Sequence, residues 1–184
     1  ELEQIFTSGK QADVPVLIGS NADESTVFMP YFEPLYGKDE QGFDRYLSLQ
    51  LPEVRDQVAT AYPTSAFGDL SERWAALDTD VNFTYPMRAW ARHMQTVKSP
   101  AFLYFFTWHP PIAQRDSYKS FHAAEIGYVF GDLTVFGAQP VAADFRFSNV
   151  MMNIWTTFAK TGDPNVAELP QWQAFTAEGE DYME

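Results

Sequence analysis

The sequence of 184 residues contains no cysteine, which excludes disulfides, thiolate metal sites and a cysteine nucleophile. Basic residues are also scarce, at 12 against 25 acidic residues, which gives a formal net charge of -13. Binding to nucleic acid or to an anionic membrane surface needs clustered lysine and arginine, so we expect neither. No apolar run approaches the roughly 20 residues of a membrane-spanning helix. The lack of cysteine favours a bacterial or other cysteine-poor context and leaves cytoplasmic and secreted locations undecided.

Patterns for a serine nucleophile and for metal binding are missing as well. The one pair of glycines with nucleophile-elbow spacing is Gly127 and Gly131, and its centre is Val129 rather than serine. No two histidines stand three or four residues apart, and no segment matches a calcium loop or a glycine-rich phosphate loop. We therefore expect no nucleophile in this chain, no metal and no cofactor.

The residues that are present predict one α/β domain over residues 1–184. Hydrophobic residues make up 46% of the chain and aromatic residues 16%, enough for a substantial core. Apolar runs predict buried strands at 14–18, ended by Gly19, and at 101–107. Helical spacing predicts a helical stretch within 39–62 that is broken at Pro52, and a further helix that begins at a capping box at 69–72. Two more helices are predicted at 80–97 and at 147–158, the last with Gly162 as its C-cap. The domain is mostly helical, with too few strands to complete a sheet.

Two residues that follow the predicted strands are candidates for acid–base chemistry. His122 lies in a loop after the second strand, where a catalytic imidazole belongs in an open α/β sheet. Glu24 follows the first strand, and a carboxylate there can orient a histidine. From spacing alone, helix capping by Asp23 or Glu24 is the favoured interpretation. His93 is expected at the surface, and His109 in a structural role.

Five ordered segments of the chain resemble the type-B carboxylesterase family, which includes cholinesterases and bacterial para-nitrobenzyl esterases. Two of them hold the candidates above, and the last contains a glycine, aspartate and proline at the end of a predicted helix. The resemblance covers nearly the whole chain and corresponds to roughly the last third of a family member. The segments are Val14-Pro-Val-Leu-Ile-Gly-Ser-Asn-Ala-Asp-Glu24, Asp80-Val-Asn-Phe-Thr-Tyr-Pro86, Ala101-Phe-Leu-Tyr-Phe-Phe106, Phe121-His-Ala-Ala-Glu-Ile-Gly-Tyr-Val-Phe-Gly131 and Trp155-Thr-Thr-Phe-Ala-Lys-Thr-Gly-Asp-Pro-Asn165.

The resemblance implies roles for three residues in ester hydrolysis. Glu24 takes the place of the family's catalytic acid, and His122 that of the general base. Glu125 takes the place of a glutamate that supports the histidine segment; a plain surface carboxylate is the alternative. Asp23, the neighbour of Glu24, is then expected to cap the following helix or to meet solvent.

Three further positions bear on the substrate pocket. Phe28 matches an aromatic residue that shapes the family's acyl pocket, with plain packing as the alternative. Val27 and Ala124 stand where cholinesterases carry aromatic residues that hold a quaternary ammonium, so a cation–π cage is not expected.

The resemblance predicts the C-terminal part of an α/β-hydrolase fold that uses a Ser-His-Glu mechanism on small esters. The nucleophile would come from a missing N-terminal segment or a second chain, and this chain alone would be inactive. Because the two strands would lie bare, we expect them to pair with another chain. The alternative function is a non-catalytic, cholinesterase-like binding or adhesion module, in which the fold is kept and triad residues are lost.

Overall fold

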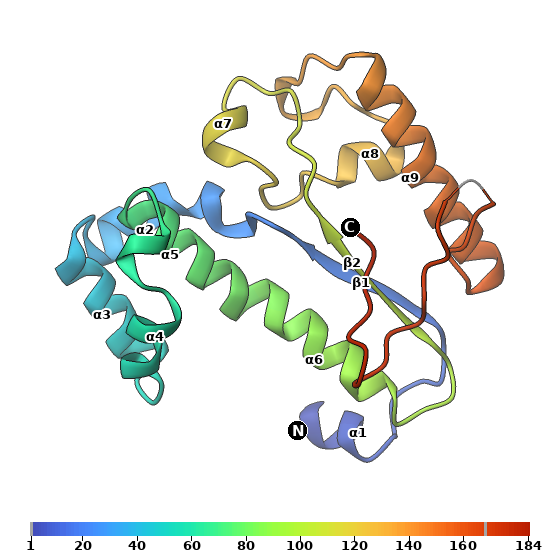
Figure 1. Ribbon diagram of the computed structural model, residues 1–184, viewed down its shortest axis with the longest axis horizontal. Helices are drawn as coiled ribbons and strands as arrows, with labels where there is room; N and C mark the ends of the chain where they lie inside the picture. Colours follow the sequence, from blue (N-terminus) through green and yellow to red (C-terminus); the bar gives the residue numbers. More distant parts are fainter. Residues whose placement is uncertain (1, 168) are drawn as a thin grey trace.

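The computed structural model describes residues 2–167 and 169–184, and two parallel strands lie at its centre (Figure 1). β1 (Val16–Asn21) pairs with β2 (Ala101–Phe106) in a register that runs from Val16 opposite Ala101 to Asn21 opposite Phe106. The prediction that Gly19 ends the first strand is wrong. Gly19 lies inside β1, where a Cβ atom would be 2.2 Å from the carbonyl oxygen of Tyr104. The glycine therefore permits close approach of the two strands rather than a turn.

Both faces of the strand pair are covered, so the expectation that these faces lie bare is wrong, whereas pairing of the strands with another chain stays a prediction. On one face, Ala91 and Met94 of α6 (Tyr85–Met94) pack with Ile18 and Leu103. On the other, Ile154 of α9 (Ala142–Thr161) packs with strand and C-terminal residues, among them Phe102 and Trp172. The central arrangement is thus helix, sheet, helix, which is the layering of an α/β fold.

The two strands differ in their outer edges. The C-terminal segment runs along β2, where Met183 accepts a hydrogen bond from Phe105 N (2.8 Å) and donates one to Leu103 O (2.9 Å). Earlier in the same segment, Phe175 N donates to Ala101 O at 2.8 Å. In the described part of the chain, no strand pairs with the outer edge of β1. β2 is therefore an inner strand and β1 an edge strand.

A lobe of short helices extends from the end of β1 and lies apart from the strands (Figure 1). It has an aromatic core built around Phe43, Tyr46 and Trp74. The predicted break at Pro52 and the predicted cap at Asp69 are both confirmed, since Asp69 Oδ1 accepts a hydrogen bond from Glu72 N at 2.9 Å. The lobe consists of η1 (Glu24–Phe28), α2 (Met29–Tyr36), α3 (Glu40–Gln50), α4 (Arg55–Ala61), η2 (Thr64–Ala66) and α5 (Leu70–Thr79).

One long helical path leads from this lobe back under the sheet. α5 passes into α6 through a π-helical turn, η3 (Asp80–Thr84), and the backbone stays helical at both junctions. Pro86 sits in the first turn of α6, directly after the π-helical turn, and has no N–H to donate to that turn. The wide turn therefore joins the helix that packs in the lobe to the helix that packs on the strands.

The remaining elements form the opposite half of the molecule. α9 ends at Gly162, which has a left-handed conformation (φ 76°), as predicted. Near the other end of α9, the buried Asp144 accepts hydrogen bonds from Val141 N (2.8 Å), Trp108 Nε1 (2.9 Å) and Tyr128 OH (2.8 Å). Asp144 thereby joins three segments of this half. The other elements are α1 (Leu2–Thr7), α7 (Arg115–Tyr118), α8 (Ile126–Phe130) and η4 (Val135–Gly137).

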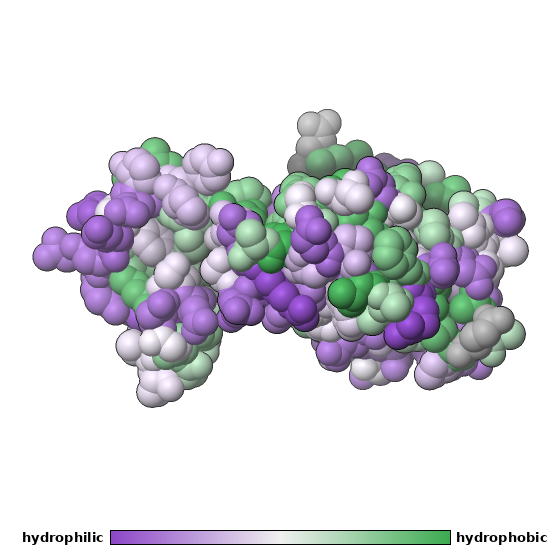
Figure 2. All heavy atoms as spheres, turned by 90° about the horizontal axis from the view of Figure 1, so that it is seen from above, coloured by the Kyte–Doolittle hydropathy of each residue, from purple (hydrophilic) through white to green (hydrophobic). Residues whose placement is uncertain are grey.

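The surface differs between the two halves (Figure 2). Hydrophilic side chains dominate the far end of the α2–α5 lobe, whereas apolar ones are scattered over the opposite half. Several exposed apolar side chains of that half belong to α8, η4 and the start of α9: Ile126, Phe130, Phe136 and Phe145. Among the helices described, none combines the length and apolarity needed to cross a membrane.

Candidate active site

A short hydrogen bond joins the two candidates for acid–base chemistry. Glu24 Oε2 lies 2.7 Å from His122 Nδ1, so the predicted contact between this carboxylate and this imidazole is present. β1 ends at Asn21 and places Glu24 in the first turn of η1. His122 lies in the long connection that follows β2, a strand parallel to β1. The contact thus forms at the carboxyl ends of two adjacent parallel strands.

Glu24 is fixed by three further features. Its other carboxylate oxygen, Oε1, accepts a hydrogen bond from Asn21 N at 2.7 Å. Its backbone oxygen accepts one from His122 N at 3.2 Å. The side chain is only 7% exposed. Burial raises the pKa of Glu24, and the nearby Glu125 raises it further, while the hydrogen bonds from Asn21 and His122 act in the opposite direction.

One ring nitrogen of His122 is bonded to Glu24, and about half of the side chain is exposed. Its side chain is 49% exposed, and its ring lies beside Phe28 and Phe83, at centroid distances of 5.5 and 5.1 Å. Within residues 2–167 and 169–184, no group forms a hydrogen bond with Nε2. When Nδ1 donates its proton to Glu24, Nε2 carries the lone pair, which is the state a general base requires.

Asn21 links the histidine segment to β1, and the sequence did not single it out. Its Nδ2 donates to Phe121 O at 2.8 Å and to Glu125 Oε2 at 2.7 Å, and the residue is only 1% exposed. Glu125 therefore contacts the site through Asn21 rather than through His122 itself. The position of Asn21, at the last residue of a strand and three before the acid, is the local signal that could have drawn attention to it.

Asp23 also binds the histidine segment, which corrects the expectation that it caps η1 or meets solvent. Its Oδ2 accepts a hydrogen bond from Ser120 N at 3.2 Å, and its backbone N donates to Ser120 O at 3.1 Å. No side-chain cap of η1 is formed. Both neighbouring carboxylates therefore face the same segment, because η1 turns directly after the strand instead of continuing its alternation.

The other residues singled out in the sequence lie in varied surroundings. Ala124 is 2% exposed in a hydrophobic cluster around Phe121 and Tyr128, and the partly buried Val27 packs against that cluster. The third residue predicted for a substrate pocket, Phe28, has its ring centroid 5.5 Å from that of His122. His93, predicted at the surface, is partly buried, with its ring beside that of Phe6, and His109 Nε2 lies 4.0 Å from Asp23 Oδ2.

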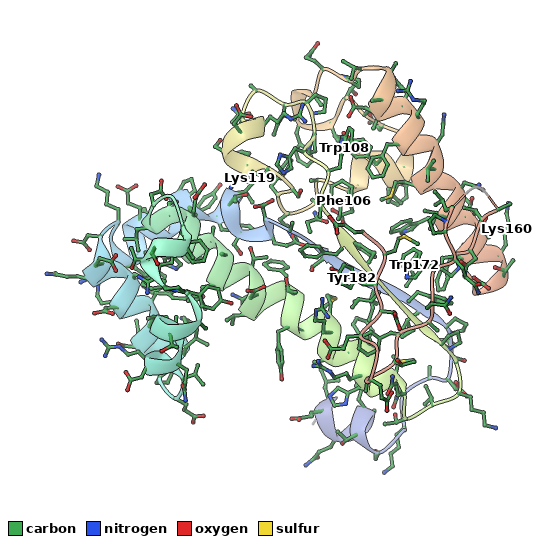
Figure 3. The ribbon with its side chains drawn as sticks, in the orientation of Figure 1. Phe106, Trp108, Lys119, Lys160, Trp172 and Tyr182 are labelled. Atoms are coloured by element: carbon green, nitrogen blue, oxygen red, sulfur yellow. The ribbon has the colours of Figure 1, made fainter. Side chains whose placement is uncertain are left out.

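A cavity of about 530 Å³ lies beside the candidate site rather than on it. It is bounded by η1, α5 and the end of α7, and its lining includes Asp23, Thr79 and Lys119 but neither Glu24 nor His122. Lys119 spans from the connection after α7 toward the lobe, where its Nζ is 3.2 Å from Glu72 Oε1 (Figure 3). His122 therefore opens onto the molecular surface. In the part of the chain that is described, no group of three or more histidine or acidic residues could hold a metal ion.

Comparison with known proteins places the chain in one family. A model of the carboxylesterase family matches residues 2–184. The chain is 31% identical over 186 residues to para-nitrobenzyl esterase of Bacillus subtilis (strain 168), an alignment covering 97% of the chain and 35% of that protein. It is 27% identical over 192 residues to cholinesterase of Mus musculus, covering 95% of the chain and 32% of the relative.

Solved structures agree with the sequence relatives. A structure of PNB esterase superimposes with a TM-score of 0.69 and 27% identity, covering 96% of this chain and 35% of that one. The predicted α/β-hydrolase fold class is thereby confirmed, and so is the resemblance on which it rested. The chain spans about a third of the length of the relatives it matches.

Proposed function

Because the chain belongs to the carboxylesterase family, we propose that it supplies the acid and the general base of a carboxylic ester hydrolase. The observation that carries the proposal is the 2.7 Å contact between Glu24 Oε2 and His122 Nδ1, in a ring whose side chain is half exposed and whose Nε2 forms no hydrogen bond with the described residues. An oriented imidazole with one free nitrogen is the arrangement that activates a hydroxyl nucleophile.

The reaction has two steps that use the same two residues. In the first, His122 Nε2 takes the proton of a serine hydroxyl while the serine oxygen attacks the ester carbonyl, and then gives the proton to the leaving alcohol. In the second, His122 takes a proton from water, which hydrolyses the acyl-enzyme, and returns it to the serine. Glu24 keeps the Nδ1 proton in place and stabilises the imidazolium formed in each step.

The serine and the oxyanion donors come from outside residues 1–184 in this proposal. No serine of the chain lies in an elbow motif, and the matched relatives are about three times as long as the aligned region. The outer edge of β1, which pairs with no strand among the described residues, offers backbone groups to a further strand. A covalently continuous segment and a separate chain would serve this purpose equally.

The alternative is a binding or adhesion module with the same fold. Such a module needs neither Glu24 nor His122, so the hydrogen bond between them favours the enzyme. The residue at the elbow of the missing segment distinguishes the two functions, because serine there supports an esterase, whereas glycine or alanine supports a binding protein.

The substrate is proposed to be a neutral, fairly apolar ester. Val27 and Ala124 are not aromatic, and an aromatic face contributes about 2 kcal/mol or more to binding a desolvated quaternary ammonium. The net charge of -13 attracts cations, but surface charge is screened beyond about 8 Å at physiological salt. Hydrolysis of butyl butyrate should therefore exceed that of butyrylcholine; the reverse order would contradict this specificity.

The central proposal is tested by complementation. The 184-residue chain is assayed with para-nitrophenyl butyrate, alone and together with the segment that carries the family's nucleophile. We expect no enzymatic hydrolysis by the chain alone and hydrolysis by the pair that is lost in His122→Ala. Hydrolysis by the chain alone, lost in His122→Ala but resistant to a serine-directed phosphonate, would contradict the proposal, as would a complemented pair that does not need His122.

A further inference from the structure

A second buried carboxylate, Asp78, lies close to Glu24 and has no part in the mechanism above. It belongs to the last turn of α5 and is 4% exposed. Three neutral donors converge on it: Ser25 Oγ at 2.6 Å on Oδ2, and Tyr46 OH at 2.5 Å and Asn82 Nδ2 at 2.9 Å on Oδ1. Since a carboxylate only accepts hydrogen bonds, Asp78 can satisfy all three donors at once.

Ser25 connects this cluster to the candidate site, because it directly follows Glu24 in the chain. The serine is fully buried, and both its hydroxyl and its backbone N–H are bonded to the end of α5, to Asp78 and to Thr79 Oγ1 (3.0 Å) respectively. The residue on the other side of Glu24 leaves η1 uncapped, since Asp23 binds Ser120 instead. The first turn of η1 is therefore held to α5 through Ser25.

We propose that Asp78 is a positioning residue for the Glu24–His122 pair: it binds Ser25 Oγ, fixes the first turn of η1, and so keeps the Glu24 carboxylate on His122 Nδ1. This inference depends on the proposed function, in which that contact sets the proton on the imidazole. Glu24 is then held by two parts of the molecule. The histidine segment binds the backbone oxygen and a carboxylate oxygen of Glu24. Helix α5 binds Ser25, the residue that follows Glu24.

Asp78 also anchors the site to the core of the lobe. Tyr46, its second donor, packs against Trp74 and Phe32 within the aromatic cluster. Burial and the contact with Asp78 both raise the pKa of Tyr46, so the phenol keeps its proton and remains a donor. An asparagine in place of Asp78 would have nearly the same shape but would present an NH₂ group to one of the donors.

The test measures the tautomer of His122 rather than a rate. Ring ¹⁵N chemical shifts of the 184-residue chain, recorded at a pH where the imidazole is neutral, give the fraction of His122 that carries its proton on Nδ1. The variants are Ser25→Ala and Asp78→Asn, with Glu24→Gln as the reference for a broken pair. Tyr46→Phe is the matched control, because it also removes one hydrogen bond from Asp78 but leaves the bond to Ser25. Thermal unfolding of each variant measures stability separately.

We expect Nδ1–H to dominate in the unmodified chain and to fall at least twofold in Ser25→Ala and Asp78→Asn, but to stay unchanged in Tyr46→Phe. If Asp78→Asn does not fold, Ser25→Ala decides. A tautomer fraction that moves in Glu24→Gln but not in Ser25→Ala would overturn the positioning role and leave the acid–base pair standing. A fraction that does not respond to Glu24→Gln either would overturn the proposed pair itself.

Discussion

Glu24 and Asp144 are both buried carboxylates, and they differ in what surrounds them. Asp144 accepts three hydrogen bonds, from a backbone N–H, an indole and a phenol, and Arg115 adds a favourable charge. Burial acts against the charged form, but these contacts together lower the pKa of Asp144. Glu24 accepts one backbone N–H and one imidazole N–H, with the carboxylate of Glu125 nearby, and burial leaves its pKa raised.

The difference in pKa distinguishes a carboxylate whose charge stabilises the fold from one whose charge destabilises it. A lowered pKa means that the folded state favours the charged form, so ionised Asp144 contributes stability. A raised pKa means that ionised Glu24 subtracts from stability at neutral pH. Such an unfavourable placement is typical of functional sites rather than of structural ones.

The largest difference is expected in catalysis. In the protein completed with its nucleophile, Glu24→Gln should lower kcat for para-nitrophenyl butyrate by up to about 10⁴, as when the acid of a triad is made neutral. Asp144→Asn, which changes a carboxylate outside the site, should leave kcat of the folded fraction within about threefold of the original value. Asp23→Asn serves as a neighbouring control and should cost far less than Glu24→Gln, because its partner is the backbone of Ser120. The reverse order of Glu24 and Asp23 would show that the acid is wrongly assigned.

For the free energy of unfolding, the substitution at Asp144 should have the larger effect and the substitution at Glu24 the smaller one. Asp144→Asn should lower the free energy of unfolding at pH 7 by about 1–3 kcal/mol, because its NH₂ group leaves one buried donor without an acceptor. Glu24→Gln should leave this free energy unchanged or raise it, since the amide still accepts from Asn21 N and can donate to His122 Nδ1. Urea denaturation of both variants measures the two values. An equal loss in both would mean that Glu24 is as much a structural anchor as Asp144.

The smallest effects concern pH. Relative to Asp144→Asn, the unmodified chain should keep a constant advantage above pH 3.8 and lose it as the pH falls through the lowered pKa of Asp144. Relative to Glu24→Gln, it should gain stability as the pH falls through the raised pKa of Glu24 toward 4.5. Each unit of pKa shift corresponds to roughly 1.4 kcal/mol. The measurement is the free energy of unfolding of the unmodified chain and of both variants between pH 3 and pH 7. The comparison would be contradicted if the stability of the unmodified chain relative to Asp144→Asn and its stability relative to Glu24→Gln changed in the same direction with pH.

Local signals in the sequence predicted much of the fold. The cap at Asp69, the break at Pro52 and the end of α9 at Gly162 are each determined by residues within one turn of the feature. Gly19 was misread for the same reason: a glycine after an apolar run signals a turn, whereas here it makes room for Tyr104 across the sheet. That role depends on a strand more than 80 residues away.

The candidate site was predictable only in part. Positions after the two strands indicate Glu24 and His122 as candidates, the resemblance implies their roles, and the contact between them is present. Asn21, Phe83 and Asp78 act through partners that other segments bring to them, and no local pattern identifies those partners. The resemblance predicts Ala124 in the substrate pocket, because it stands at a family position two residues after the histidine, but the chain buries it in the core.

The π-helical turn at η3 makes the molecule sensitive to the number of residues between lobe and sheet as well as to their identity. A π turn holds one residue more than an α turn needs, and each residue of an α-helix rotates the next by about 100°. Deleting one residue within 80–84 would restore a regular helix and rotate α6 against α5 by that angle. Ala91 and Met94 would then leave the sheet, or Asp78 would leave Ser25. Among homologous sequences, the length of this segment should therefore stay constant even where its residues differ.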